Sequence, residues 1–249
     1  MIALQHITKV FNRGQVNEVT ALKDVSLSVT KGEFVIVVGS NGSGKSTLFN
    51  IIAGAETPTT GQVLIDNKDV TKLAEYKRSR WIARVFQNPL SGTAPDLSII
   101  DNFRLAALRT SDKKLVIGVN EAFKKTVREK IATLGMGLEN KIEQQMGSLS
   151  GGQRQALTLL MSVMDKTDIL LLDEPTAALD PRSANTILQT ADKLIKQYNL
   201  TAILITHNLK DAFQYGTRLV QMNEGTVLRD LNQEQKAGLK QTDLFEWFS

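Results

Sequence analysis

The chain has 249 residues, of which 42% are hydrophobic and 22% charged, and its formal net charge is +4 at pH 7. These values are typical of a globular protein with a sizeable core, and the charge is too small to indicate nucleic-acid binding by itself. The absence of cysteine excludes disulfides and thiolate metal sites, and no apolar run reaches the roughly 18 residues of a membrane span. The N-terminus lacks the pattern of a secretory signal, so we expect a cytosolic location.

Short runs of β-forming residues recur along the chain. We expect strands at residues 2–11, 33–39, 61–66, 83–87, 168–173, 201–206 and 219–228, the last with an Asn-Glu-Gly turn. The runs at 34, 169 and 202 are apolar without alternation, as strands covered on both faces of a parallel sheet are. Helical patterns follow them, which is typical of an α/β fold.

From about residue 97 to 165 the hydrophobic spacing is helical. Two apolar stripes have this spacing: Phe123, Val127, Ile131 and Leu134, and Leu157, Leu160 and Met164. PLSGTAP at 89–95 has the Pro, Gly and Ser content of a hinge. We therefore expect an all-helical insertion in the α/β core, with both stripes packed in its interior.

The same region is basic. Between Arg104 and Lys130, eight Lys or Arg and three Asp or Glu leave a charge of +5. Two interpretations are open: a solvated helix face, or a surface near anionic lipid to which Lys113 and Lys114 contribute.

A phosphate-loop pattern occupies residues 39–46. GSNGSGKS matches G-x-x-x-x-G-K-[ST], with an apolar strand before it and an amphipathic helix after it. The glycines let backbone N–H groups surround phosphates without Cβ clashes, and the helix N-terminus adds partial positive charge. We expect Lys45 to reach the β- and γ-phosphates of a nucleotide and the Ser46 hydroxyl to bind Mg²⁺. The alternative is a glycine-rich turn with an incidental lysine.

Two adjacent carboxylates end a predicted buried strand in ILLLDEP at 169–175. Strand alternation points them in different directions, so we expect Asp173 to hold Mg²⁺ through water and Glu174 to orient or deprotonate an attacking water. Alone, such a pair indicates a solvated turn, but the phosphate loop favours catalysis. His207 ends another predicted strand and is either a γ-phosphate contact or a structural histidine.

Together these residues resemble one family, the ATP-binding subunits of ABC transporters, over nearly the whole chain. The motifs occur in that family's order: Phe11, GSNGSGKST at 39–47, Gln87, LSGGQ at 149–153, ILLLDEP at 169–175, ALD at 178–180 and His207. The resemblance implies an α/β P-loop NTPase core with a parallel sheet, an N-terminal antiparallel β-subdomain and an inserted α-helical subdomain. It implies one domain over residues 1–249, with 1–90 and 166–249 as core and about 91–165 as the helical subdomain.

The resemblance also assigns site residues for ATP and Mg²⁺. Phe11 stacks on adenine, and the phosphates are held by Ser40, Asn41, Gly42, Ser43, Gly44, Lys45, Ser46 and Thr47. The metal ligands are Ser46, Gln87 and Asp173, and the catalytic residues are Glu174, His207, Gln87 and Lys45. The ATP of an opposite subunit is bound by Ser150, Gly151, Gly152, Gln153 and Asp180. A site of hydroxyl, amides and helix dipole without lysine binds nucleotide weakly alone, so we expect it to complete a site on another copy.

The implied partners are a second copy of the chain in the ATP-bound state, membrane permease subunits and, indirectly, an extracellular substrate-binding protein. We expect residues 88–102 to contact the permease and the chain to lie at the cytoplasmic face of the cell membrane. Three segments are similar to import-type ATPases, some of them associated with tryptophan or tyrosine uptake: VFQNPLSGTAPDLSIIDN, GSLSGGQRQALTLLM and DEPTAALDP. No nucleic-acid partner is expected. The alternatives are an ABC-type ATPase that acts on nucleic acid or ribosomes, and a phosphate-loop kinase.

Overall fold

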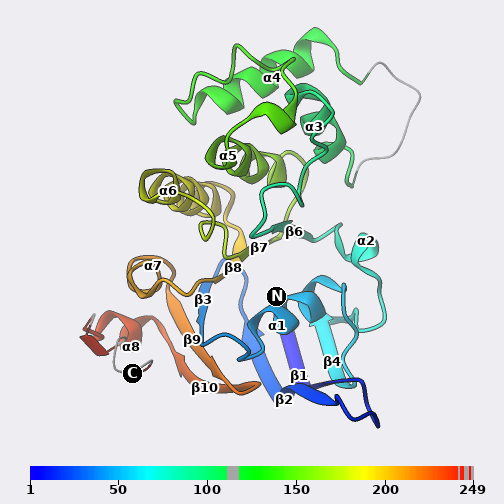
Figure 1. Ribbon diagram of the computed structural model, residues 1–249, viewed down its shortest axis with the longest axis vertical. Coiled ribbons are helices and arrows are strands. Elements are labelled where there is room, and N and C mark those ends of the chain that lie inside the picture. Colours follow the sequence, from blue (N-terminus) through cyan, green and yellow to red (C-terminus); the bar gives the residue numbers. More distant parts are fainter. Residues whose placement is uncertain (111–117, 241, 244–246, 248–249) are drawn as a thin grey trace. The chain divides into compact units, whose positions relative to one another are not determined.

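The computed structural model describes residues 1–110, 118–240, 242–243 and 247. It divides into two compact units, one made of residues 1–78 and 199–249 and the other of residues 79–198. Figure 1 labels the helices and strands of both units.

An antiparallel sheet forms the first part of the unit that contains both ends of the chain. Its strands are β1 (Ile2–Phe11), β2 (Val19–Val29), β4 (Thr60–Ile65) and β5 (Lys68–Asp69), in the order β2-β1-β4-β5. In β2, Val25, Leu27 and Val29 are buried and alternate with exposed residues, so one face of the strand packs inward. The expected N-terminal antiparallel subdomain is confirmed, although β2 and β5 were not predicted.

Parallel strands form the second sheet of this unit. β3 (Phe34–Val38) runs parallel to β8 (Thr201–Ile205) and to β9 (Arg218–Asn223), and β10 (Thr226–Leu231) is antiparallel to β9. Every residue of β3 and β8 is buried, as their unbroken apolar sequences predict. The predicted turn in the run at 219–228 is confirmed as the β9–β10 connection at Glu224 and Gly225.

The described residues of this unit also form four helices: α1 (Lys45–Ala53), α2 (Glu75–Arg78), α7 (Leu209–Gln214) and α8 (Gln233–Ala237). α1 ends at Gly54, whose φ of 87° is in the left-handed region that favours glycine. Arg78 is 1% exposed and donates to the carbonyl oxygens of Ile51 at 2.6 Å and Ile52 at 2.9 Å. This buried guanidinium therefore satisfies carbonyls at the last turn of α1.

Lys236 in α8 is a second buried cation. Its side chain donates to the carbonyl oxygens of Tyr215 and Gly216, the latter at 2.7 Å, just beyond the end of α7. Burial lowers the pKa of Lys236 to about 8 from its ordinary value of 10.5. Between these two values the unfolded chain binds more protons than the folded chain, so this group makes the free energy of unfolding rise with pH.

We expect this dependence to disappear in Lys236→Met. The free energy of unfolding of the wild-type chain minus that of the variant should rise between about pH 8 and 10, by at most about 3 kcal/mol. Urea denaturation of both proteins across this range measures the difference. The contributions of the other titrating groups are the same in both proteins and cancel in this difference. A difference that is independent of pH would mean that Lys236 titrates alike in the folded and unfolded chains.

The second unit combines two parallel strands with helices. β6 (Ile82–Val85) pairs with β7 (Ile169–Asp173), and Val85 lies opposite Leu172. The helices are α3 (Ile99–Ala106), α4 (Glu121–Ala132), the 3₁₀ helix η1 (Met146–Ser148), α5 (Gly151–Ser162) and α6 (Pro181–Tyr198). Figure 1 shows α3, α4 and α5 gathered beside α6. Ser98, Asn120 and Ser150 are the N-caps of α3, α4 and α5, and their side chains accept backbone hydrogen bonds there.

Both predicted stripes pack inside this helical group. Val127 and Ile131 of α4 are fully buried, as is Leu157 of α5, while Phe123 is half-buried. The predicted helical extent is wrong at two ends, because α4 stops before Leu134 and α5 stops before Met164. Among the residues that the structure describes, no helix is both long and apolar enough to cross a bilayer.

Candidate nucleotide-binding site

The phosphate loop connects β3 to α1. Gly42 and Gly44 have left-handed backbones with φ of 80° and 98°, and α1 begins at Lys45. A Cβ at Gly39 would lie 2.4 Å from the carbonyl oxygen of Met222, so the loop requires glycine where it meets β9. This geometry places a glycine-rich turn directly before a helix N-terminus, an arrangement that suits phosphate binding.

Lys45 is pre-positioned by the loop itself. The residue is 6% exposed, and its ammonium group donates to the carbonyl oxygens of Gly39 at 2.7 Å and Ser40 at 2.9 Å. The hydroxyl oxygen of Ser43 is buried and has no hydrogen-bond partner among the described residues. A concave loop with a cation and spare polar atoms fits an oxygen-rich anion such as a triphosphate.

His207 lies at the same sheet edge as the phosphate loop. β3 and β8 are parallel and Val37 pairs with Ile205, so the loop and His207 both follow the carboxyl ends of adjacent strands. His207 is exposed at this edge. Burial raises the pKa of nearby Asp211, while the electrostatic effect of His207 acts in the opposite direction. The structure therefore places His207 where ligands bind in open α/β sheets.

Phe11 comes close to the loop through β2. Phe11 pairs with Val19, and two residues further along β2 the carbonyl oxygen of Ala21 would lie 2.6 Å from a Cβ placed on Gly44. The ammonium of Lys9 lies 4.7 Å from the centre of the Phe11 ring. Phe11, the phosphate loop and His207 thus belong to one unit, and strand pairing gathers the segments that carry them.

Asp173 ends β7 in the other unit, and Glu174 follows it. Arg84 of β6 donates to Asp173 Oδ2 at 2.6 Å, and their side chains are only 12% and 14% exposed. Glu174 lies outside the strand with a left-handed φ of 44°. Strand alternation was predicted to separate the two side chains, and this reason is wrong. The left-handed backbone of Glu174, beyond the end of the strand, sets the direction of its side chain. The pairing of β6 with β7 also brings Gln87, which is exposed, to the same edge.

The LSGGQ motif at 149–153, the signature of this family, contains the N-cap of α5. Ser150 Oγ accepts from the backbone N–H of Gln153 at 3.3 Å, and Gln153 Oε1 accepts from the N–H of Ser150 at 3.1 Å. This capping box leaves Ser150 and Gly151 exposed at the helix N-terminus. A Cβ on Gly152 would lie 2.8 Å from Ser183 Oγ, so glycine allows α5 to pack closely on α6.

Asp180 belongs to the same neighbourhood as the signature. Its Oδ1 accepts from the backbone N–H groups of Arg182 at 3.1 Å and Ser183 at 3.0 Å, at the start of α6. The hydrogen bonds from Ser183 lower the pKa of Asp180, so its carboxyl stays ionised. Since Gly152 contacts Ser183, the structure brings the signature and Asp180 together on one unit.

Two residues of this unit were missed by the sequence analysis. Arg84 binds Asp173, and Gln155 of α5 donates to the carbonyl oxygens of Phe86 at 2.9 Å and Pro175 at 3.1 Å. The only sequence signal was a polar residue inside an otherwise apolar strand or helix, IARV and QALTLLM. The predicted site residues thus form two sets, one in each unit, and the closure of the two sets around one nucleotide stays a prediction.

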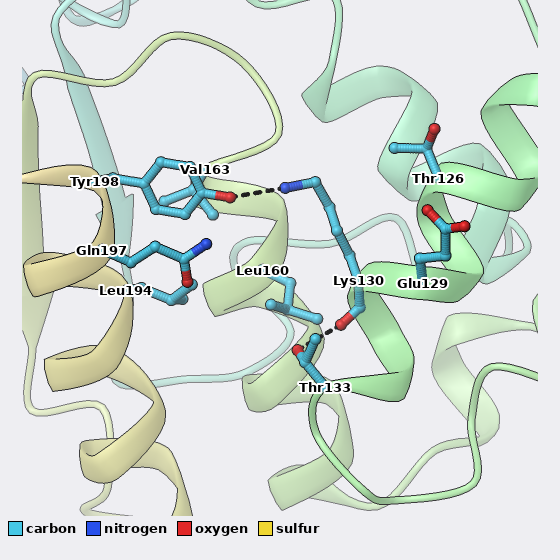
Figure 2. A pocket seen from close by; sticks show the side chains of 9 residues that line it. All are labelled: Thr126, Glu129, Lys130, Thr133, Leu160, Val163, Leu194, Gln197 and Tyr198. Atoms are coloured by element: carbon cyan, nitrogen blue, oxygen red, sulfur yellow. Dashed lines mark hydrogen bonds between the residues drawn. The ribbon is translucent and has the colours of Figure 1, made fainter.

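Several basic residues between Arg104 and Lys130 interact with other residues of their own unit. Lys124 lies 3.2 Å from Glu143, which raises the pKa of that lysine, and Lys130 donates to the Tyr198 hydroxyl at 2.9 Å. Figure 2 shows the Lys130–Tyr198 bond at a pocket of about 270 Å³ between α4, α5 and α6, which is lined by none of the predicted site residues. These contacts favour a solvated helix face, while Lys113 and Lys114 lie outside the described residues.

Known proteins resemble the chain over most of its length. Residues 22–177 match the family model described as ABC transporter. The tyrosine transport ATP-binding protein of Clostridioides difficile (strain R20291) is 36% identical over 251 residues, covering 100% of the chain and 98% of that protein. The methionine import ATP-binding protein MetN 1 of Bacillus thuringiensis subsp. konkukian (strain 97-27) is 33% identical, covering 92% of the chain and 66% of that protein.

A solved structure extends the resemblance to the fold. The dimeric post-hydrolysis structure of the ATP-binding cassette MJ0796, bound to ADP and Pi, has a TM-score of 0.81 and 30% identity, covering 94% of the chain and 99% of that chain. The family match spans more than half of the sequence, and the phosphate loop has the geometry that this fold needs to bind nucleotide. The chain belongs to the ABC transporter family, as one of its ATP-binding and ATP-hydrolysing components with a role in transport.

Proposed function

We propose that the chain energises the import of an amino acid through separate membrane permease subunits. The observation that carries this proposal is the match, end to end, with a protein named for tyrosine transport. A second relative is named for methionine import. We also infer that residues 1–249 work as one ATPase domain, in which about 91–165 form the helical subdomain.

The first set of site residues would bind ATP. Phe11 offers a ring face to adenine, and Lys45 with the N–H groups of residues 40–47 offers positive charge and donors to the phosphates. Glu174 would accept a proton from the attacking water, and Gln87 and His207 would orient the water and the γ-phosphate. Hydrolysis would then remove the γ-phosphate, which is the group that both sets contact.

Mg²⁺ fits the oxygen donors at this site. Ser46 supplies a hydroxyl, Gln87 an amide oxygen and Asp173 a carboxylate, of which Oδ2 is bound by Arg84. Mg²⁺ usually keeps several waters and binds through one or two carboxylates and the phosphates of its substrate, and Asp173 would supply such a carboxylate. Bound Mg²⁺ would neutralise charge on the β- and γ-phosphates.

The signature would serve the ATP of a second copy. Ser150 and Gly151 are exposed at the start of α5, and the site has hydroxyl, amide and dipole contributions but no lysine. Such a site would bind ATP weakly by itself. It would complete the binding site around an ATP that Lys45 of the other copy already holds. ATP would therefore join two chains, and the loss of its γ-phosphate would let them part.

The permease contact would lie in the segment 88–102. Leu90 and Leu97 are 47% and 40% exposed, so both are accessible to a partner. Asn102 is 2% exposed and exchanges hydrogen bonds with Ala94 at 2.8 and 3.0 Å, so it shapes the segment and cannot itself touch a partner. Docking through 88–101 would hold the chain peripherally at the cytoplasmic face of the membrane. A binding protein would take part only indirectly.

Reconstitution tests the proposal. The chain and the permease encoded beside it would be placed in liposomes with ATP inside and labelled tyrosine, tryptophan or methionine on the binding-protein side. We expect uptake of an aromatic amino acid that requires ATP, and no uptake with Lys45→Ala. ATP hydrolysis stimulated by DNA or ribosomes, and unaffected by the permease, would instead favour the non-transport alternative.

A further inference from the structure

Gln155 is a polar side chain in the interior of α5. It is 0% exposed, and its single amide group donates two hydrogen bonds, to the carbonyl oxygens of Phe86 at 2.9 Å and Pro175 at 3.1 Å. Its amide oxygen is buried without a hydrogen-bond partner among the described residues. A methionine of similar size would bury no such oxygen but could not donate to these two carbonyls, so the glutamine is needed here for its two donors.

The two acceptors of Gln155 lie next to two candidate catalytic residues. Phe86 precedes Gln87, and Pro175 follows Glu174. The paired residues of β6 and β7 end at Val85 and Leu172, so the backbone ladder no longer ties the two segments together beyond that point. Beyond that point the side-chain amide of Gln155 connects the two segments, because it donates to one carbonyl of each.

The backbone of Glu174 needs such support. Its φ of 44° is a left-handed conformation that a residue with a Cβ adopts at a cost and keeps only when its surroundings fix it. The carbonyl of Glu174 accepts from the N–H of Ala177 at 3.2 Å, and the bond from Gln155 fixes the next peptide. Gln155 therefore holds the turn that directs the Glu174 carboxylate.

We propose that Gln155 is a positioning residue that fixes Gln87 and Glu174 relative to each other and links both to the signature helix. α5 begins at the signature, so its N-terminal residues and Gln155 move as one rigid element. When the ATP of a second copy binds the signature, any resulting shift of α5 would therefore also move Gln87 and Glu174 of the same chain. This proposal rests on the roles proposed above for Gln87 and Glu174.

Gln155→Met tests the proposal, since it keeps the size of the side chain and removes both donors. We expect kcat to fall about tenfold, because displaced catalytic groups lose rate, while the affinity for a fluorescent ATP analogue is unchanged. Hydrogen exchange should rise at residues 86–90 and 174–178. The matched control is Thr158→Val, one turn later on the same helix, where a buried hydroxyl donates only to the carbonyl of Arg154. It should alter neither kcat nor exchange at those segments.

A double-mutant cycle separates positioning from general damage. In Gln155→Met combined with Gln87→Ala, we expect kcat to fall by less than the product of the two single losses, since Gln155 acts in part through Gln87. Should Gln155→Met not fold, Gln155→Leu is a second apolar variant that lacks both donors. Unchanged kcat and exchange in the folded variant, additive losses, or an equal loss in Thr158→Val would overturn the proposal. Wild-type turnover retained by Gln87→Ala and Glu174→Gln would instead refute their assigned roles.

Discussion

Glu174→Gln is expected to bind ATP with undiminished affinity and to lose turnover by about 10²- to 10⁴-fold, the usual contribution of a positioned general base. The amide preserves the size of the side chain but cannot accept the proton of the attacking water. Because the γ-phosphate then stays in place, the variant should accumulate as an ATP-bound dimer. Steady-state ATPase assays measure the first effect, and size-exclusion chromatography with light scattering in MgATP measures the second.

The same substitution at Glu224 is a matched control. Glu224 also has a left-handed backbone, with φ of 45°, but it lies in the exposed turn between β9 and β10. Glu224→Gln therefore changes the same charge in a similar conformation and should hydrolyse ATP normally. Normal turnover in Glu174→Gln would refute the assignment of Glu174 as the base, even if a dimer formed.

The sequence predicted the fold where one physical signal was dominant. β3, β7 and β8 were predictable because strands buried on both faces leave unbroken apolar runs. β2 was missed although Val25, Leu27 and Val29 alternate with polar residues, a period-two pattern that itself indicates a strand with one buried face. The ends of α4 and α5 were placed too late, because the apolar spacing continues into turns that the helices do not reach.

The candidate site was predictable as motifs but not as contacts. The loop at 39–46 and the carboxylates after β7 are local in sequence, and strand order places each at a sheet edge. The bond between Arg84 and Asp173 exists only because β6 pairs with β7, a contact 89 residues apart in the chain. Ser150 and Gln153 are a different case, since S-x-x-Q is a local capping-box pattern that the phosphate interpretation overlooked.

Ser150→Arg and Lys45→Ala should separate the two halves of the composite site. Lys45→Ala removes a cation from the phosphate loop, so we expect the chain's own ATP affinity to fall on the order of 10- to 100-fold. Ser150→Arg should bind ATP as well as the wild-type chain, because the signature serves the other copy. In the Glu174→Gln background it should nevertheless remain monomeric in MgATP, since the larger side chain obstructs the start of α5. Nucleotide titration and light scattering measure the two properties on the same samples.

The helix cap at Ser150 requires its own control, because its loss alone weakens α5 by about 1 kcal/mol. Ser98 caps α3 in the same way, with its hydroxyl accepting from the N–H of Asp101. Ser98→Arg loses an equivalent cap and gains the same charge at the start of another helix, so in the same background it should still dimerise. Equal losses of ATP affinity in Lys45→Ala and Ser150→Arg would place both residues in one site of a single chain. That result would remove the reason for ATP to join two copies.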